Sequence, residues 1–328
     1  MSNGRSISVI IPAYNAAEFI IEALESICKQ TLLPLEVLVI NDGSTDNTRG
    51  VIESWLEKVE LKFAVHFFNQ ENQGLPNTRN RGIKKANGEW IALLDADDIW
   101  EPEHLQVLHD GLELVPTAVA SYGAGRVLTE QGLQELFYDD FWGNPSKKFG
   151  IPINTKSYLI DRKILPTLFK GNFIKPSSLL FSRKIADDIS LFNEQLKTCE
   201  DREFLIRLIT KGNFVYSADA ITQYRWHEDN ISQHKNAKKN LANTLLALSA
   251  IRENKSLQLS AKESSALKTE TKLAIKEFLY VCAEAGWKDY KEGFGFVKNL
   301  HSNYLNTMEF LHINHVIRTF LCKLPWSK

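Results

Sequence analysis

The first hundred residues alternate between short apolar runs and segments with helical periodicity. Apolar runs of this kind, rich in β-branched side chains, are typical of strands that are buried on both faces. The stretches between them repeat apolar side chains every three or four positions, as an amphipathic helix does. The alternation predicts an α/β fold with a mostly parallel sheet flanked by helices. The expected strands are residues 7–11, 37–40, 64–68 and 90–94.

Start signals place three helices between these strands. Asn15, with Glu18 three residues later, matches a capping box and predicts that the first helix begins there. Asp46 or Thr48 is expected to open the second helix, and residues 77–86 are expected to form the third. Helices therefore separate the expected strands, as the connections of a parallel sheet require.

Polar residues directly follow three of the four expected strands. They are Tyr14-Asn15, Asp42-Gly43-Ser44 and the acidic run Asp95-Ala96-Asp97-Asp98. In open parallel sheets, ligands bind at the carboxyl ends of the strands. The sequence therefore predicts one ligand site to which these three clusters contribute.

The acidic run has the chemistry of a site for a divalent cation. Mg²⁺ and Mn²⁺ prefer carboxylate and phosphate oxygens and need few protein ligands. In extended chain, Asp95 and Asp97 point to one side and Asp98 to the other. The alternative is a solvated acidic turn or a helix cap, because short acidic matches are frequent by chance.

Two side chains near the strand ends are candidates for binding a nucleobase. Asp42 can accept a hydrogen bond from the imide N–H of a base, and the glycine after it allows close approach of the backbone. Tyr14 can stack on the base. The alternatives are ordinary turn chemistry for Asp42, since Asn, Asp and Gly dominate turns, and a half-buried ring for Tyr14.

Three more side chains are candidates for chemistry beside a phosphate group. Asp201, near the start of an expected helix, can take a proton from an attacking hydroxyl, or it can simply stabilise the first helical turn. His227 can ligate a metal or contact phosphate, or it can be a structural histidine. Arg79 can face phosphates or lie solvated on its helix.

The rest of the chain divides at about residue 235. Residues 130–175 are rich in aromatic residues, Gly and Pro, and are expected to form a long excursion beside the site. A helix starting near Glu200 and a strand over residues 214–226 complete the expected first domain, residues 1–235. Residues 236–328 are expected to be a helical extension.

Composition argues against several classes of protein. The formal net charge is −1, so nucleic acid is not an expected partner. The four cysteines lie far apart, without metal-ligand spacing, and are interpreted as reduced thiols. Residues 1–15 lack a signal-peptide pattern, and the apolar runs are shorter than the roughly 20 residues of a spanning helix. A cytoplasmic protein is expected, with any membrane contact peripheral.

Taken in order, the segments described above resemble a known family. They closely resemble the inverting family-2 glycosyltransferases, which have the GT-A fold, over about residues 6–232. The sequence departs from the family at Leu75-Pro76-Asn77-Thr78, where the family has small residues. This departure leaves open how the third helix starts but does not affect the chemistry. The segments that carry the resemblance are residues 9–15, 39–46, 72–74, 77–82, 94–98, 172–174, 177–178, 200–202 and 224–227.

The resemblance implies how a sugar donor is bound. Pro12, Tyr14 and Asn15 at the end of the first strand would hold the nucleobase together with Asp42. The base is usually uracil in the family, and Asp42 would bind its imide. Arg79 would line the diphosphate side.

The resemblance also implies roles for the acidic groups and the histidine. Asp95 would contact the ribose or the diphosphate, and Asp97 would bind the metal, Mn²⁺ or Mg²⁺. Asp98 is adjacent and would support either role. His227 matches a position that contacts the metal or the diphosphate in some members, and Asp201 matches the catalytic base.

The implied reaction is a single in-line displacement with inversion at the anomeric carbon. The donor would be a nucleotide-diphosphate sugar, a UDP-sugar above all, carrying a hexosyl or N-acetylhexosaminyl group. The acceptor hydroxyl would belong to a glycan or lipid-linked glycan, in the synthesis of bacterial surface polysaccharide or glycoconjugates. Residues 310–328, which lack acidic residues, are expected either to join the helical extension or to rest on the inner membrane face.

Other functions remain as alternatives. A nucleotidyltransferase also uses clustered carboxylates and metal, but it needs a Gly-rich, basic loop where residues 12–15 contain neither Gly nor Arg. A dinucleotide-dependent oxidoreductase would need G-x-G-x-x-G at the same place. A non-catalytic nucleotide-sugar-binding protein or scaffold would need Asp42 but neither Asp97 nor Asp201.

Overall fold

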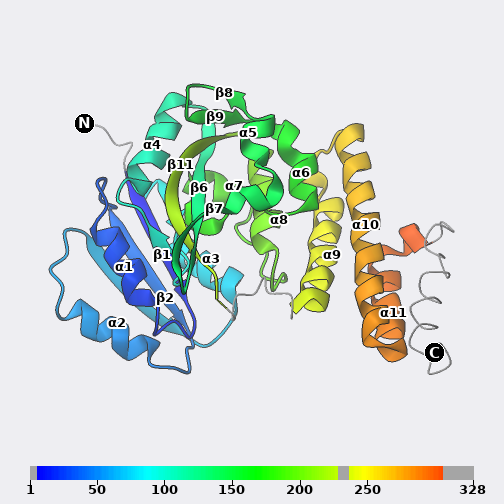
Figure 1. The fold of residues 1–328 in the computed structure, drawn as a ribbon, viewed down its shortest axis with the longest axis horizontal. Helices are drawn as coiled ribbons and strands as arrows, with labels where there is room; N and C mark the ends of the chain where they lie inside the picture. Colours follow the sequence, from blue (N-terminus) through cyan, green and yellow to red (C-terminus); the bar gives the residue numbers. More distant parts are fainter. Residues whose placement is uncertain (1–5, 228–235, 306–328) are drawn as a thin grey trace. The chain divides into compact units, whose positions relative to one another are not determined.

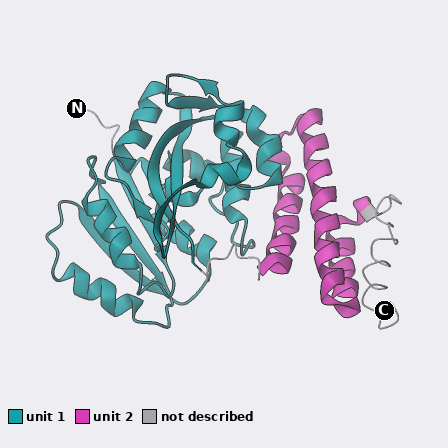
Figure 2. Ribbon diagram, in the orientation of Figure 1, with its two compact units in different colours: residues 1–228 teal, residues 229–328 magenta. Residues whose placement is uncertain are grey.

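The computed structural model describes residues 6–227 and 236–305, and the chain divides into two compact units (Figures 1 and 2). The first unit, residues 1–228, contains all the strands found in the described residues. The second, residues 229–328, is helical where it is described. The division lies close to the domain boundary that the sequence predicts at residue 235.

The N-terminal half of the first unit is a parallel layer of four strands. These are β1 (Ile7–Ala13), β2 (Glu36–Asp42), β3 (Ala64–Gln70) and β4 (Trp90–Leu93), in the order β3-β2-β1-β4. All neighbouring pairs are parallel, so the carboxyl ends of the strands meet at one edge. The four strands predicted from the apolar runs are confirmed.

Helices cover both faces of this layer. The helix α1 (Ile20–Cys28) shares a buried apolar cluster with Val9 of β1. The helix α3 (Leu75–Lys85) packs on the other face, where Gly82 faces Ile10. Adjacent residues of a strand point to opposite faces, so β1 contributes to the core on both sides of the sheet. The remaining helices of the unit are α2 (Thr48–Leu56), α4 (His104–Leu114), α5 (Pro145–Phe149), α6 (Leu165–Lys170), α7 (Arg183–Asp188) and α8 (Glu200–Ile209).

The second half of the sheet is mixed. The strand β10 (Leu179–Ser182) is antiparallel to both β4 and β6 (Ala118–Thr129). The long curved strand β11 (Asn213–Arg225) is parallel to β6 and antiparallel to β5 (Ile99–Trp100) and β9 (Ser157–Ile160) (Figure 1). The sheet is therefore all-parallel from β3 to β4 and becomes mixed where β10 inserts between β4 and β6 in the opposite direction.

Sequence pattern predicted part of this second half. The helix α8 confirms the helix expected near Glu200, and β11 confirms the strand expected over residues 214–226. The strands β6 and β10 were not predicted. In β6 the run Ala118-Val-Ala-Ser-Tyr-Gly-Ala-Gly is rich in small residues, which have little strand propensity. Its burial between β10 and β11 outweighs that weak signal.

Residues 130–175 contain more regular structure than the expected excursion. After β6 the chain turns back through β7 (Gly132–Phe137), and two short strands follow that pair with each other, of which β9 also pairs with β11. This segment lies against the strands that carry the second half of the site. Its elements, besides α5, α6 and β9, are β7 (Gly132–Phe137), the 3-10 helix η2 (Tyr138–Trp142), β8 (Ile151–Pro152) and η3 (Arg162–Ile164).

The second unit consists of α9 (Ala237–Glu253), α10 (Ala261–Ala285) and α11 (Trp287–Leu305), with the short η6 (Lys255–Leu257) between the first two. This agrees with the helical extension expected there. Across residues 6–227 and 236–305, no helix combines the length and apolar character needed to cross a membrane. The segment 310–328, for which membrane contact was considered, lies outside the described residues.

Two helix starts differ from what the sequence suggests. Asn15 does not cap α1, which begins at Ile20; Asn15 has a φ of +50° and its side chain binds the loop after β2 instead. The capping-box prediction was therefore wrong. The helix α3 begins regularly after Gly74, with Pro76 in its first turn, where the missing N–H costs nothing. The unusual residues before Arg79 are thus compatible with this helix.

The turn after β2 requires glycine for two reasons. Gly43 has a φ of +68°, and a Cβ on it would lie 2.7 Å from the backbone nitrogen of Asn72. We expect Gly43→Ala to lower the free energy of unfolding by about 1–2 kcal/mol for the left-handed backbone and by about 1–3 kcal/mol more for the clash. Urea unfolding measures the sum.

Gly143 provides the matched control for this prediction. It has a similar φ of +65°, but nothing lies within 4 Å of the Cβ that alanine would add. Gly143→Ala should therefore lower the free energy of unfolding only by the contribution of the left-handed backbone, about 1–2 kcal/mol. Equal losses of stability in the two variants would show that the approach of Asn72 to Gly43 imposes no constraint.

Candidate active site

The carboxylate of Asp42 organises the loop between β3 and α3. The side chain is 3% exposed and accepts hydrogen bonds from Gln70 Nε2 at 2.7 Å and from the backbone nitrogens of Gln73 and Gly74, each at 2.9 Å. A carboxylate has about four acceptor positions, so one is left for a further donor. The structure thus makes Asp42 a structural anchor and leaves it capacity for the predicted contact with a base.

The loop after β1 is tied to the loop after β2. The backbone nitrogen of Asn15 donates to Ser44 Oγ at 3.0 Å, and Asn15 Oδ1 accepts from the backbone nitrogen of Thr45 at 2.8 Å. These bonds hold the ring of Tyr14 at the carboxyl edge of the sheet, where it is 52% exposed. Pro12 is buried within β1. Of the predicted base-binding residues, Tyr14 therefore has the open ring face that stacking needs.

The three aspartates after β4 point in three directions. Asp95 Oδ1 faces Arg79 Nη2 at 2.8 Å, and Asp97 Oδ2 lies 3.1 Å from His227 Nε2. Asp98 is 2% exposed and accepts from Ser177 Oγ at 2.5 Å and from the backbone nitrogen of Arg225 at 3.0 Å. A turn sets these directions, because the backbone nitrogen of Asp98 donates to the backbone oxygen of Asp95 at 3.1 Å, so the alternation expected for extended chain does not hold here.

The structure places Asp98, for which the resemblance implies a supporting role beside the donor, beneath the acidic loop. Each of its oxygens already accepts a hydrogen bond from the protein, and the group is buried beneath the cluster. Burial, with the charges of Asp97 and Asp95, raises the pKa of the Asp98 carboxyl well above its ordinary value. Ser177 Oγ also accepts from the backbone nitrogen of Asp95 at 3.1 Å, so Asp98 and Ser177 together support the loop.

A change of register in β11 brings His227 to the acidic loop. The pairing of β11 with β6 shifts between Ser217 and Thr222, and the strand then pairs with β5, directly after the aspartates. Such irregularities bend a strand and redirect its end. As a result Arg225 Nε donates to the backbone oxygen of Asp97 at 2.9 Å, and His227 follows two residues later.

Arg79 is buried between two carboxylates. It is 1% exposed, with Nη1 at 2.7 Å from Glu200 Oε1 and Nη2 at 2.8 Å from Asp95 Oδ1, and its guanidinium lies 5.5 Å from the ring centroid of Phe192. Burial alone lowers the pKa of the guanidinium, but the charges of Asp95 and Glu200 outweigh it and raise the pKa, so Arg79 stays charged. The solvated position considered from the sequence is wrong. Arg79 instead links the loop after β4 to the start of α8.

Asp201 follows Glu200 in the first turn of α8 and is held in place from two sides. Its Oδ2 accepts from Asn172 Nδ2 at 2.7 Å and its Oδ1 accepts from the backbone nitrogen of Arg202 at 2.6 Å. Asn172 is itself fixed, because its Oδ1 accepts from the backbone nitrogen of Ile174 at 3.1 Å. In the sequence, Asn172 is marked only by its place in a segment that resembles the family, and no local pattern predicts this orienting role.

The structure therefore brings together most of the predicted site residues. Through Arg79, the acidic loop with Asp95 and Asp97 meets the start of α8 with Asp201, and β11 adds His227. Asp42 lies at the end of β2, two strands from β4 in the order β2-β1-β4, which corresponds to about 10 Å across the sheet.

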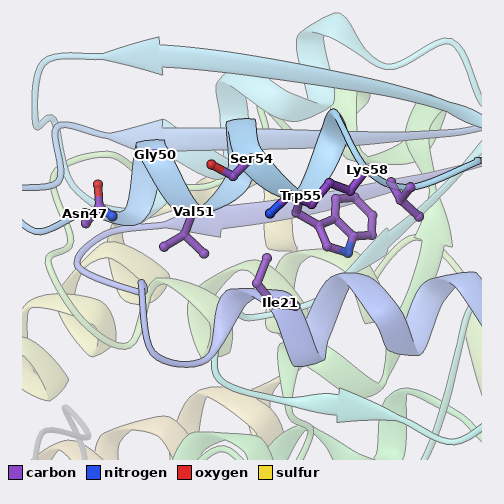
Figure 3. Close-up of a pocket in the computed structure, with 8 residues that line it drawn as sticks. Ile21, Asn47, Gly50, Val51, Ser54, Trp55 and Lys58 are labelled. Carbon is purple, nitrogen blue, oxygen red and sulfur yellow. The ribbon is translucent and has the colours of Figure 1, made fainter.

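A separate surface hollow lies between α1 and α2 (Figure 3). It is lined by apolar and uncharged polar side chains with one lysine, and none of the lining residues is acidic or a histidine. It therefore lacks groups for metal binding or acid–base chemistry. The lining residues are Ile21, Asn47, Gly50, Val51, Ser54, Trp55, Lys58 and Val59.

The Arg79 bridge generates a prediction about stability. Arg79→Met leaves Asp95 and Glu200 without their common partner, and we expect the free energy of unfolding to fall by about 3–5 kcal/mol near neutral pH. Burial, with the charge of Asp201, raises the pKa of Glu200 above its ordinary value of 4.5, although Arg79 opposes this. A buried carboxyl whose pKa is raised on folding lowers the stability of the protein as the pH rises from its ordinary pKa towards the raised one. The deficit of the variant should therefore shrink as the pH is lowered towards 4.5.

Urea unfolding at several pH values measures this deficit. Lys84→Met, at an exposed position of the same helix, is the control and should stay within about 0.5 kcal/mol of the unmodified protein. A deficit for Arg79→Met that is the same at every pH would contradict the role of the bridge in compensating the charge of Glu200.

Comparison with known proteins identifies the family of the chain. Residues 8–169 match the family described as Glycosyl transferase family 2. An uncharacterized glycosyltransferase of Haemophilus influenzae is 30% identical over 245 residues, which cover 73% of this chain and 71% of the relative. The putative teichuronic acid biosynthesis glycosyltransferase TuaG of Bacillus subtilis is 26% identical over 70% of this chain and 82% of its own. Two glycosyltransferase relatives from Rickettsia felis and Rickettsia conorii are longer, and the matches span about a third of them, 34% in each.

Two solved structures have a similar fold. TarS residues 1–349 of S. aureus, in complex with UDP-GlcNAc, has a TM-score of 0.63 with 18% identity, over 91% of this chain and 82% of that one. The mannosyltransferase PcManGT of Pyrobaculum calidifontis, in complex with GDP-Man and Mn²⁺, has a TM-score of 0.59 with 18% identity, over 98% and 88% of the two chains. The fold class predicted from the sequence is confirmed, and the chain belongs to glycosyltransferase family 2.

Proposed function

We propose that this protein is an inverting glycosyltransferase that moves a sugar from a UDP-sugar to an acceptor hydroxyl, with a divalent cation and Asp201 as general base. One observation carries the proposal. Arg79 bridges Asp95 and Glu200, and so holds a carboxylate suited to proton abstraction beside an acidic loop suited to a cation and a diphosphate. A binding protein without catalysis has no need for such a convergence.

The donor side of the proposal rests on β1 and β2. Asp42 retains one acceptor position for the imide of a base, and the exposed ring of Tyr14 lies at the same edge. The about 10 Å between the ends of β2 and β4 suits a nucleoside with its base at Asp42 and its diphosphate near Asp95 and Asp97. The structurally similar TarS is known in complex with UDP-GlcNAc, which favours uracil as the base.

The metal side rests on Asp97 and His227. Asp97 Oδ2 and His227 Nε2 are 3.1 Å apart, close enough for both atoms to bind one ion. A carboxylate with an imidazole fits Mn²⁺ better than Mg²⁺, which strongly prefers oxygen. The bound cation would stabilise the charge that develops on the leaving diphosphate. The structurally similar mannosyltransferase holds Mn²⁺.

The chemical step is carried by Asp201. Its carboxylate takes the proton of the acceptor hydroxyl, and that oxygen attacks the anomeric carbon from the face opposite the diphosphate. The bond to the diphosphate oxygen breaks, and the anomeric configuration inverts. Asn172 holds Asp201 Oδ2, so the carboxylate keeps one orientation during the step.

The acceptor that we propose is a glycan or lipid-linked glycan of the bacterial surface. The relative TuaG bears a name from teichuronic acid biosynthesis, which supports a role in surface polysaccharide synthesis. A cytoplasmic location, peripheral at the inner membrane face, belongs to the same proposal. Whether residues 310–328 bind membrane can be read from vesicle sedimentation with and without that segment.

Asp201→Asn tests the role of the base. The amide keeps the shape of the side chain but cannot take a proton, so we expect the rate of Mn²⁺-dependent UDP release from UDP-GlcNAc to fall about 10²–10⁴-fold. UDP binding, measured by calorimetry, should stay nearly unchanged. Asp188→Asn, at an exposed position on α7, is the control. Retained UDP release in Asp201→Asn would remove Asp201 as the base.

Asp97→Asn tests the metal site. In the presence of UDP we expect the dissociation constant for Mn²⁺, read by electron paramagnetic resonance, to rise about tenfold or more. Asp110→Asn is the control, because the exposed Asp110 belongs to a different group, with the buried His109 and the exposed Glu113, whose ligand atoms lie within 4.8 Å of one another. A larger effect in Asp110→Asn would move the cation site to that group.

A further inference from the structure

Four aromatic side chains form a continuous cluster beside the candidate active site. The ring of Tyr138 lies 5.5 Å from that of Tyr224 and 6.2 Å from that of Phe141, measured between centroids. The ring of Trp226 lies 6.3 Å from both Tyr224 and Phe141. Two segments that are far apart in the sequence, η2 and the end of β11, therefore share one cluster.

The inner two rings are fixed by polar contacts. Lys175 Nζ lies 3.6 Å from the ring centroid of Tyr224 and 4.2 Å from that of Tyr138, so one ammonium group holds both rings by cation–π attraction. The hydroxyl of Tyr138 also donates to the backbone oxygen of Asn172 at 3.0 Å. The outer rings, Phe141 and Trp226, therefore pack against two rings that are held in place.

The outer two rings are open to solvent. Phe141 is 55% exposed and Trp226 is 38% exposed, and their planes are inclined by only 25°. Two large, nearly parallel rings that are held in place offer solvent an apolar surface that a ligand can cover. Their 6.3 Å separation leaves no room for a third ring between them. A ligand would therefore pack on an outward face of the pair.

The cluster with Phe141 and Trp226 is connected both to the candidate metal ligands and to the candidate base, Asp201. Trp226 directly precedes His227, whose ring contacts Asp97. On the other side, Tyr138 donates to Asn172, whose side chain holds Asp201. The cluster that carries the pair is therefore connected to a candidate metal ligand through the chain and to the candidate base through Asn172. Phe141 is in η2 and Trp226 directly follows β11, whereas the predicted base-binding residues lie in or directly after β1 and β2, beyond β4 in the sheet.

We infer that Phe141 and Trp226 form the acceptor-binding surface of this protein, on which a pyranose ring of the acceptor packs with one of its hydroxyls directed to Asp201. The inference rests on the proposed function. A pyranose fits this surface because one of its faces presents C–H groups, which an aromatic ring face attracts, while its hydroxyls remain at the edge. Asp201 needs a partner hydroxyl within hydrogen-bond reach, and a sugar edge supplies one.

Saturation-transfer difference NMR with simple glycosides tests this surface. The probes are the methyl α- and β-glycosides of glucose, galactose and N-acetylglucosamine, each added to the full chain with UDP and Mn²⁺. We expect saturation of the ring C–H protons of at least one glycoside. That signal should fall at least about fivefold in Phe141→Ala and in Trp226→Ala, and Trp226→Phe, which keeps an aromatic face, should retain most of it.

The matched control is Phe149→Ala. Phe149 is 52% exposed and lies in the same region of the sequence, but outside this cluster, so its loss should leave the glycoside signal unchanged. Equal signals in all variants, or no signal with the unmodified protein, would overturn the inference. UDP binding by calorimetry separates the two proposals: its absence in the unmodified protein contradicts the proposed function itself, whereas its retention with no effect at Phe141 and Trp226 contradicts only the acceptor surface.

Discussion

The ion pairs of Arg79 are the interaction on which the candidate site depends. A guanidinium that is 1% exposed can remain charged only with close partners, and here the partners come from two separate parts of the chain, Asp95 and Glu200. The arrangement links the parallel half of the sheet to helix α8. It also keeps Glu200 from becoming an uncompensated charge directly beside Asp201. The positions of the acidic loop and of the candidate base are therefore coupled.

A second connection lies beneath the acidic loop. Ser177 Oγ donates to Asp98 Oδ2 and accepts from the backbone nitrogen of Asp95, and the backbone nitrogen of Arg225 in β11 donates to Asp98 Oδ1. The register of β11 against β6 shifts between Ser217 and Thr222, and beyond this shift the strand pairs with β5, next to this connection. The irregular part of the sheet is thus the part that completes the site with His227.

The two halves of the sheet have different tasks in the proposed reaction. The parallel half, β1 to β4, supplies the loops suited to a nucleotide and a cation, as strand ends in parallel sheets commonly do. The mixed half carries the segments that hold Asp201, through Asn172, and the paired rings of Phe141 and Trp226. In the proposed reaction the first half would hold the donor and the second half the acceptor.

The sequence by itself determined the parallel half and the positions of its polar loops. Strand and helix periods are local properties, so β1 to β4 and the clusters at Asp42 and Asp95 to Asp98 could be predicted without knowledge of the fold. It also identified Asp201 and His227 as candidates, through the order of the segments that resemble the family.

Tertiary structure decided which of these groups have partners. Arg79 and Glu200 are 121 positions apart and Asp97 and His227 are 130 apart, so no local pattern could show that they meet. The same holds for the burial of Asp98, for the bond from Asn172 to Asp201 and for the rings of Phe141 and Trp226. Asn15 shows the reverse case: its sequence context favours a helix cap, but the loop after β2 offers its side chain a better set of donors. Local periodicity comes from the chain alone, whereas the choice of partner depends on which distant groups the folded sheet places within hydrogen-bond reach.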